Sequence, residues 1–239
     1  MEKNLFFAMI SFLVITSCQT GTVVQKKESC SKPDKLCALT FDDGPDIKMT
    51  PRVLDKLERH KVVATFFVIG QLVNDETKGV LKRIVSMGCE IGNHSWEWKS
   101  MNSLTKEEIK ESIDKTTSSI SKYAGVSPKF FRPPNLAVSD TMYDTIDMPF
   151  VEGVLGFDWA GCGTSAEDRA KNVLKEMKDG AIILLHDVQP EPHPTPDALD
   201  ILIPELKRQG YEFVTLSELF KRKGVNPKKL TKGMWKYVE

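Results

Sequence analysis

Leu36-Cys37-Ala38-Leu39-Thr40-Phe41 is a run of apolar and β-branched residues that leads directly into Asp42-Asp43-Gly44-Pro45. We expect this run to form a β-strand, with two carboxylates at its carboxyl end and a Gly-Pro turn after them. Adjacent carboxylates repel each other unless a cation or a proton intervenes, so one can ligate a metal while its neighbour faces a water. An acidic turn without a chemical role is the alternative, because Asp-Gly-Pro is also ordinary turn chemistry.

Similar short runs recur along the chain and alternate with longer helical patterns. Strands are predicted at 36–41, 62–69, 90–93, 130–132, 150–157, 181–185 and 213–215, and helices at 51–60, 76–87, 105–123, 165–177 and 196–209. Ser103 or Thr105 suits the start of one helix, and Pro196 the start of another. This alternation indicates an α/β fold of parallel strands and crossover helices. The pattern alone leaves a closed barrel and an open doubly wound sheet as alternatives.

Composition limits the class of protein. The chain has 239 residues, of which 41% are hydrophobic and 28% charged, which is enough for a single sizeable core. Lys+Arg and Asp+Glu both number 33, so the formal net charge is zero. Nothing in this balance favours a nucleic acid as partner, whereas a neutral polymer such as a glycan fits it well.

The first residues are typical of an export signal. An apolar run at 5–15 follows Lys3 and is too short to span a bilayer as a mature helix. It ends in Val14-Ile15-Thr16-Ser17-Cys18, which resembles the bacterial lipobox. We expect residues 1–17 to be a signal peptide and Cys18 to carry a lipid, with a plain cleaved signal as the alternative. The chain would then be an exported bacterial lipoprotein, membrane-anchored in the periplasm or at the cell surface.

The remaining boundaries follow from composition. Residues 18–35 are polar and predict a tether between the lipidated Cys18 and a folded domain over 36–220. The basic tail at 221–239 contains Trp235 and Tyr237, and either packs as a final segment or stays mobile.

Four further cysteines would be exported with the domain: Cys30, Cys37, Cys89 and Cys162. They allow three complete disulfide pairings, and the sequence does not choose among them. Cys30 and Cys37 are close enough in the chain for a disulfide that would fix the segment leading into the first strand. Free buried thiols are an equally good interpretation.

Four more polar clusters follow predicted strands. They are Gly92-Asn93-His94-Ser95-Trp96, Phe131-Arg132-Pro133-Pro134-Asn135, Asp158-Trp159, and the His186-Asp187 pair that ends the run Ile182-Ile183-Leu184-Leu185. Taken singly, each cluster is also explained by packing in the core. Burying polar groups costs free energy, so five polar clusters at the carboxyl ends of parallel strands indicate a chemical role. Together they predict an active site.

In order and approximate spacing, the five clusters resemble those of the NodB-like polysaccharide deacetylases, carbohydrate esterase family 4. The resemblance extends over residues 36–220 and is fullest at Thr40–Pro45 and in the strand leading into His186. It implies a single-domain distorted (β/α) barrel. It also implies a metal-dependent hydrolase that removes acetyl groups from a polysaccharide or oligosaccharide, either O-acetyl groups of xylan-like polymers or N-acetyl groups of polymers containing N-acetylglucosamine.

The resemblance assigns the reacting groups residue by residue. Asp42 corresponds to the general base, Asp43 and His94 to metal ligands, and His186 to the general acid. The implied cofactor is a divalent metal, zinc in the first place, with cobalt or nickel as alternatives. Such an ion polarises the acetyl carbonyl, and an acid is then needed for the leaving group.

The resemblance also assigns the supporting residues. Arg132 would pair with Asp42, and Asp158 would orient His186. Trp159 would close the pocket around the acetyl methyl. The backbone N–H of Asn135 would be a donor to the oxyanion.

The sequence departs from the family pattern at two positions. Where the family has a second histidine, four residues after His94, this chain has Trp98, and an indole does not ligate a divalent metal in the usual way. We expect a site of Asp43, His94 and waters with weaker metal affinity, because Glu97 reads better as a solvated charge than as a substitute ligand. Asn135 stands where the family has an aromatic residue, which removes a wall of the groove.

These departures bear on the substrate. An incomplete metal site can hydrolyse an ester more readily than an amide, because an alkoxide is the easier leaving group and the barrier to be lowered is smaller. O-acetyl substrates are therefore slightly favoured. The proline-rich loop at 189–194 is predicted to be a groove wall. His193 within it is expected to be structural or exposed rather than in contact with substrate.

A catalytically impaired glycan-binding lipoprotein with the same barrel is the alternative from a different class. The presence of Asp42, Arg132 and His186, which binding alone would not require, favours the enzyme. A dinucleotide-binding enzyme is disfavoured, because no Gly-rich phosphate loop follows the first strand and two carboxylates there would repel a pyrophosphate.

Overall fold

The computed structural model describes residues 35–159, 165–189, 191, 193–227 and 232–239. The predicted signal peptide at 1–17, the lipid site Cys18, and the cysteines Cys30 and Cys162 lie outside the described residues, as does all but the last residue of the predicted tether. The described part belongs to one compact unit, Lys32–Glu239.

Parallel strands form the centre of this unit. Among the described residues they are β1 (Lys35–Asp42), β2 (Thr65–Val68), β3 (Glu90–Asn93), β4 (Val154–Leu155), β5 (Ala181–His186) and β6 (Tyr211–Phe213). Their order is β3-β2-β1-β5-β4, and β6 pairs with the first residues of β1. Strand β1 is central because it pairs with β5 along most of its length, from Cys37 opposite Ala181 to Asp42 opposite His186.

Two isolated parallel bridges close the sheet into a barrel. Asn93 at the end of β3 pairs with Phe131, and Phe131 pairs with Phe150. The chain then continues into β4, where Val154 pairs with β5. The ring of neighbours is therefore complete, which confirms the distorted (β/α) barrel. The predicted strand at 130–132 is reduced to the single residue Phe131, which forms both bridges, because Pro133 and Pro134 cannot donate to a ladder.

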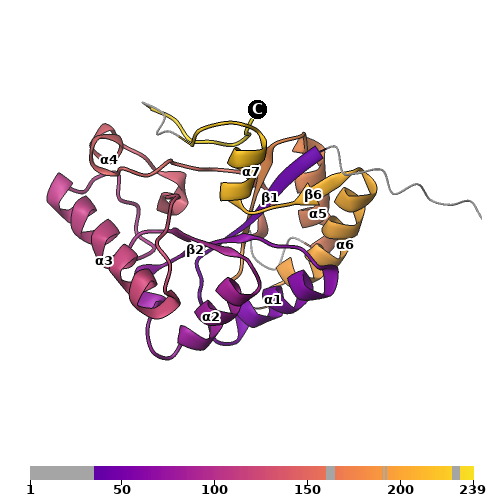
Figure 1. The fold of residues 1–239 in the computed structure, drawn as a ribbon, viewed down its shortest axis with the longest axis horizontal. Coiled ribbons are helices and arrows are strands. Elements are labelled where there is room, and N and C mark those ends of the chain that lie inside the picture. The colour runs from indigo at the N-terminus through magenta and orange to yellow at the C-terminus, as the bar shows by residue number, and fades with distance from the viewer. Residues whose placement is uncertain (1–34, 160–164, 190, 192, 228–231) are drawn as a thin grey trace, which may run out of the picture. The chain divides into compact units, whose positions relative to one another are not determined.

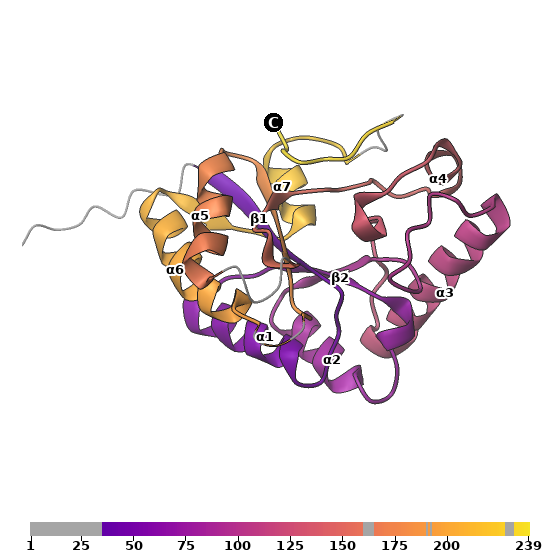
Figure 2. The same ribbon diagram turned by 180° about the vertical axis from the view of Figure 1, so that it is seen from behind.

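Helices lie outside the strands in both views (Figure 1, Figure 2). They are α1 (Met49–His60), α2 (Lys78–Ser86), α3 (Lys106–Ala124), α4 (Asp140–Thr145), α5 (Ala166–Glu176), α6 (Thr195–Arg208) and α7 (Leu216–Arg222). Thr105 caps α3 in a reciprocal capping box with Glu108, so it starts that helix rather than Ser103. Helix α6 begins one residue before Pro196. No helix of the described residues is long and apolar enough to span a bilayer.

The last residues pack onto the barrel, which is one of the two alternatives predicted for the tail. The backbone of Trp235 donates to Phe150 at 2.9 Å, and Val238 donates to Gly180 at 2.9 Å. Val238 is fully buried. The folded unit therefore includes residues 232–239, beyond the predicted boundary at 220.

Two of the cysteines are free, buried thiols. Cys37 lies in β1 and Cys89 immediately before β3. Burial raises the pKa of Cys37, and it raises the pKa of Cys89 to about 11. Both side chains pack in the apolar core, so for these two the free-thiol interpretation is the one the structure supports.

Candidate active site

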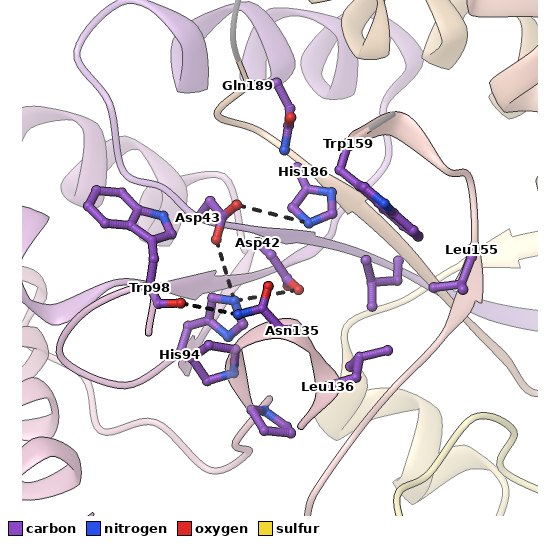
Figure 3. Close-up of a pocket in the computed structure, with 13 residues that line it drawn as sticks. Asp42, Asp43, His94, Trp98, Asn135, Leu136, Leu155, Trp159, His186 and Gln189 are labelled. Carbon is purple, nitrogen blue, oxygen red and sulfur yellow. Dashed lines mark hydrogen bonds and ion pairs between the residues drawn. The ribbon is translucent and has the colours of Figure 1, made fainter. Parts of the chain in front are cut away.

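Most of the predicted site residues meet in one pocket at the carboxyl ends of β1, β3 and β5 (Figure 3). The pocket has a volume of about 320 Å³. Its lining consists of Asp42, Asp43, His94, Trp98, Pro133, Pro134, Asn135, Leu136, Leu155, Trp159, Leu184, His186 and Gln189. Three of the five sequence clusters place charged or imidazole groups in this pocket. Arg132 and Asp158 lie behind it and contact those groups.

Asp42 is held by a buried arginine. Arg132 Nη1 donates to Asp42 Oδ1 at 2.7 Å and to Thr40 Oγ1 at 2.7 Å, and its Nη2 donates to the carbonyl of Glu152 at 2.9 Å. Arg132 is fully buried and its guanidinium stacks on the ring of Phe67 at 4.3 Å. One oxygen of Asp42 is thus fixed by a charge-assisted bond, and Oδ2 is left toward the pocket.

His94 presents one nitrogen to the two carboxylates. Its Nδ1 lies 2.7 Å from the carbonyl of Arg132, so Nδ1 carries the proton and donates. Its Nε2 lies 3.5 Å from Asp43 Oδ1 and 3.7 Å from Asp42 Oδ2. Burial alone would lower the pKa of His94, but the charges of Asp42 and Asp43 outweigh it and raise that pKa.

The pair of Asp43 and His94 fits a divalent metal ion as two of its ligands. Two ligand atoms bound to one tetrahedral ion at ~2.0–2.2 Å lie about 3.3–3.6 Å apart. The 3.5 Å between Asp43 Oδ1 and His94 Nε2 matches this separation. Among the described residues there is no group of three His, Cys, Asp or Glu side chains placed to hold an ion. A tetrahedral ion held by Asp43 and His94 alone would have two further positions for water or substrate.

Asp43 has an environment that keeps it ionised. Burial would raise its pKa, but the hydrogen bond and charge of His94, the charge of His186 and the indole of Trp98 together lower it. Its backbone is left-handed, with φ of 76°, a conformation that non-glycine residues seldom adopt. Such outliers concentrate where a side chain has to be aimed at a site.

His186 is held by Asp158. Its Nδ1 lies 2.7 Å from Asp158 Oδ1, and its backbone N–H donates to Asp158 Oδ2 at 2.6 Å. The remaining nitrogen, Nε2, lies 4.0 Å from Asp43 Oδ2. Burial would lower the pKa of His186, but Asp158 outweighs it and raises that pKa to about 9. The imidazole is therefore protonated at neutral pH and can donate a proton from Nε2.

Trp98 stands at the rim of the pocket, with 42% of its surface exposed. Residues 96–99 form a bend and not a helix, so Trp98 does not follow His94 by one helical turn. The side-chain amide of Asn135 donates to the Trp98 carbonyl at 3.3 Å and to Ser100 Oγ at 3.1 Å. Glu97 is exposed beside Lys99 and is not part of the pocket lining, in agreement with a solvated charge.

Trp159 is the opposite aromatic wall. It is 45% exposed and packs edge-on against His186, with ring centroids 5.8 Å apart, and against Phe157. From the predicted groove wall, Gln189 reaches the pocket lining. His193 is buried outside the lining, and within the described part of the chain neither of its ring nitrogens has a hydrogen-bond partner. Burial lowers the pKa of His193 to about 4, so this imidazole is neutral.

Sequence reasoning missed a second tier of buried polar residues. Thr195 Oγ1 lies 3.0 Å from Asp158 Oδ2, and Arg169 Nη1 donates to Thr195 Oγ1 at 3.2 Å. The available signal was the position of Arg169 on the buried face of its helix, beside Ala170 and Val173. Charged residues at core-facing positions are rare unless they are paired.

Asp187, which follows His186 in the last sequence cluster, is a further buried residue without a predicted role. Its carboxyl is buried and accepts from Thr50 Oγ1, directly behind the turn that contains Gly44. Burial raises the pKa of Asp187 to about 7. This carboxyl supports the turn that follows Asp43.

Comparison with known proteins adds an independent line of evidence about the family of this chain. Residues 30–148 match the family model described as polysaccharide deacetylase. A family 4 acetyl xylan esterase from Clostridium thermocellum, solved in complex with a cobalt ion, superposes with a TM-score of 0.83 and 55% identity. The match covers 85% of this chain and 99% of that one.

Two curated relatives point to different glycans. A bifunctional xylanase/deacetylase from Pseudobutyrivibrio xylanivorans is 51% identical over 193 residues, covering 81% of this chain and 32% of the relative. A peptidoglycan-N-acetylglucosamine deacetylase from Bacillus cereus is 37% identical over 196 residues, covering 80% of this chain and 90% of the relative. The chain spans only 32% to 40% of the length of several longer curated relatives.

Proposed function

This chain belongs to the polysaccharide deacetylase family, and we propose that it is a metal-dependent hydrolase that removes acetyl groups from a glycan. The observation that carries the proposal is the pairing within one pocket. Asp42 is bound to Arg132, His186 is bound to Asp158, and Asp43 and His94 face each other at the spacing of two metal ligands. A base, an acid and an ion site are thus within reach of one acetyl group.

Asp42 is the general base of the proposed reaction. Arg132, which also donates to Thr40, fixes the carboxylate from behind, and Oδ2 faces the pocket between His94 and the space a substrate would fill. A carboxylate held in this way accepts a proton from a water that attacks the acetyl carbon. Because the arginine binds Oδ1 alone, the accepting oxygen stays free.

Asp43 and His94 are the proposed ligands of a divalent ion. When bound, the ion would act as a Lewis acid toward the acetyl carbonyl. Zinc and cobalt both accept one imidazole and one carboxylate together with water. The related esterase from Clostridium thermocellum was solved with cobalt, which supports an ion of this class here. The Arg132 carbonyl fixes His94 through Nδ1 and leaves Nε2, on the side of Asp43, as the atom that would bind the ion.

His186 is the general acid. Its Nε2 bears a proton at neutral pH and points into the pocket, while Asp158 holds Nδ1. The proton goes to the oxygen or nitrogen of the sugar as the bond to the acetyl carbon breaks. Asp158 then holds the neutral imidazole in the same orientation, so that Nε2 can take up a new proton.

Asn135 and Trp159 shape the pocket around the acetyl group. The two prolines before Asn135 restrict the backbone, and Asn135 adopts φ of 57° at the pocket edge. We assign its N–H as a donor to the oxyanion, an interaction whose loss costs about 3 kcal/mol in comparable sites. Trp159 offers an apolar wall beside His186 for the acetyl methyl.

O-acetyl esters of a xylan-like chain are the favoured substrates. With one imidazole and one carboxylate as protein ligands, the ion site is sparse, and an ester needs less activation than an amide. The similarity to a xylanase/deacetylase and an acetyl xylan esterase supports the ester. Amide substrates containing N-acetylglucosamine are the alternative outcome of the test.

We further propose that the chain is an exported lipoprotein modified at Cys18. The lipobox-like Val14–Cys18 after an apolar run supports this assignment. Metabolic labelling with a fatty acid should tag the wild-type chain and leave a Cys18→Ala variant unlabelled. Equal labelling of both chains would overturn the assignment.

The test of the deacetylase is acetate release by the chain from residue 19 onward, which contains the whole unit Lys32–Glu239. Acetylated xylan and N-acetylglucosamine oligomers are each assayed with added zinc or cobalt and with a chelator. Metal-dependent release from xylan is the expected result. Release from the amide alone would reverse the substrate order, and glycan binding without release from either would identify a binding protein.

A further inference from the structure

A second buried arginine stands behind the acid side of the pocket. Arg169 from α5 is only 1% exposed, although it is one of the largest charged side chains. It donates to Thr195 Oγ1 at 3.2 Å, and Thr195 Oγ1 lies 3.0 Å from Asp158 Oδ2. The chain of contacts then continues through Asp158 to His186.

The direction of these hydrogen bonds is fixed by chemistry. A guanidinium only donates, so Thr195 Oγ1 is the acceptor of the bond from Arg169. The hydroxyl proton of Thr195 is then directed to Asp158 Oδ2, which also accepts from the backbone N–H of His186 at 2.6 Å. Both donors occupy Oδ2, and Oδ1 is left to the imidazole at 2.7 Å.

The base side of the pocket also has a buried arginine beside a threonine hydroxyl. There Arg132, also fully buried, donates to Asp42 directly and to the hydroxyl of Thr40. Asp42 and Asp158 thus each have a buried arginine and a threonine behind them, although the Thr40 hydroxyl donates to the carbonyl of Ile183 at 2.6 Å and not to Asp42. The difference is that Arg169 reaches Asp158 through the hydroxyl and not by direct contact.

The charge of Arg169 has a specific use during turnover. Asp158 is 1% exposed, and a buried carboxylate without a partner is costly. While His186 is protonated, it balances that charge. Once His186 has released its proton, the permanent cation of Arg169 is the group that still compensates Asp158 through Thr195.

We propose that Arg169 and Thr195 are positioning residues of the acid step, which hold Asp158 in the orientation that aims His186 at the leaving group. The inference rests on the proposed function, in which His186 is the general acid. A purely structural role would affect folding but would not distinguish between leaving groups.

Two substrates separate these roles. A sugar oxygen leaves only if it is protonated, whereas 4-nitrophenolate from 4-nitrophenyl acetate leaves as a stable anion and needs no acid. Thr195→Val should lower kcat on acetylated xylan by about 10-fold, with little change in KM. This loss is smaller than the roughly 10²–10⁴-fold rate enhancement that a general acid supplies, because His186 itself is still present. On 4-nitrophenyl acetate the variant should match the wild-type chain.

Three further variants complete the experiment. Thr195→Ser keeps the hydroxyl and should restore most of the loss on xylan. Arg169→Met should show the same substrate split as Thr195→Val. Thr65→Val is the matched control, because it removes a buried hydroxyl at the amino end of β2, where Thr65 Oγ1 accepts from the backbone N–H of Leu216. Equal losses on both substrates, or the same split in Thr65→Val, would overturn the proposal.

A spectroscopic readout tests the proposal without turnover. The proton between His186 Nδ1 and Asp158 should give a downfield N–H signal in the proton NMR spectrum of the wild-type chain. That signal should broaden or shift in Thr195→Val and stay in place in Thr65→Val. An unchanged signal in Thr195→Val would overturn the positioning role, whereas a wild-type chain that releases no acetate would overturn the proposed function.

Discussion

Asp42 and His186 lie opposite each other in register at the carboxyl ends of the neighbouring strands β1 and β5. The pairing of two strands thus sets the separation of the proposed base and acid before any loop contributes. Arg132 and Asp158 come from segments outside these two strands, and each fixes one of the pair from behind. Rigid strands therefore carry the reacting groups, an arrangement that favours precise geometry.

Asp42→Asn should abolish most of the activity and keep the fold. The amide can still accept from Arg132 at 2.7 Å, but it cannot take a proton from water. We expect kcat on acetylated xylan to fall by about 10²–10⁴-fold. Acetate release measures the loss, and thermal unfolding checks the fold. Asp197→Asn on the exposed surface of α6 is the control, and a comparable loss there would contradict the assignment.

Activity should decline on the alkaline side as pH rises through about 9. The pKa of His186 is raised from 6.5 to about 9, because Asp158 outweighs the opposing effect of burial. The proton that His186 donates is therefore present below that pH and lost above it. For the same reason, its pairing contributes stability that is complete below pH 6.5 and lost as pH rises through about 9.

Asp158→Asn should move that alkaline limb to lower pH, since the main cause of the raised pKa is removed. The profile of kcat/KM against pH measures the shift. Asp200→Asn is the control, because Asp200 also pairs with a histidine, His60, at 2.8 Å but outside the pocket. A limb that does not move in Asp158→Asn would show that another group titrates there.

Trp98→His should tighten metal binding. The indole at this position lines the pocket beside Asp43 but offers no lone pair, whereas an imidazole adds a third protein ligand. We expect affinity for zinc to rise about 10- to 100-fold, the size of effect that changes around a metal commonly produce. Competition with a chromogenic chelator measures it. Trp159→His, on the other wall, should leave the affinity unchanged, and equal affinities in Trp98→His and the wild type would show that position 98 does not reach the ion.

The parts of the fold that sequence predicted well are those with local causes. The strands β1 and β5 are short apolar runs, and β3 is a short segment between two helical patterns. The predicted bounds of all three differ from the observed ones by at most one residue. The helices α4 and α7 were missed because six or seven residues are too few to show a helical period. The barrel closure at Phe131 and Phe150 rests on single bridges, which leave no pattern in the sequence.

The site was predictable to the extent that its residues follow strands. Asp42, Asp43, His94 and His186 follow or end predicted strands, so topology brings them together. Arg169 and Thr195 belong to helices and reach Asp158 only through tertiary packing. The bend at 96–99 also escaped prediction, because no turn signal separates it from a helical turn.

Gly44→Ala should destabilise the chain and reduce its activity together. A Cβ at this position would clash with Asp187 Oδ2, and that carboxyl cannot yield freely because it is buried and accepts from Thr50. We expect the free energy of unfolding to fall by about 1–3 kcal/mol, as for overpacking in other interiors. The displaced turn would also move Asp43, so metal affinity should drop. Denaturant unfolding and chelator competition measure the two effects.

Gly79→Ala is the matched control for that substitution. Gly79 lies in α2, and a Cβ there meets nothing within 4 Å. Alanine is the better helix former, so this variant should gain about 0.4–1 kcal/mol of stability and keep its metal affinity. If Gly44→Ala were as stable as Gly79→Ala, Asp187 would not be fixed behind the turn. If it lost stability but kept full metal affinity, the turn would not be what aims Asp43.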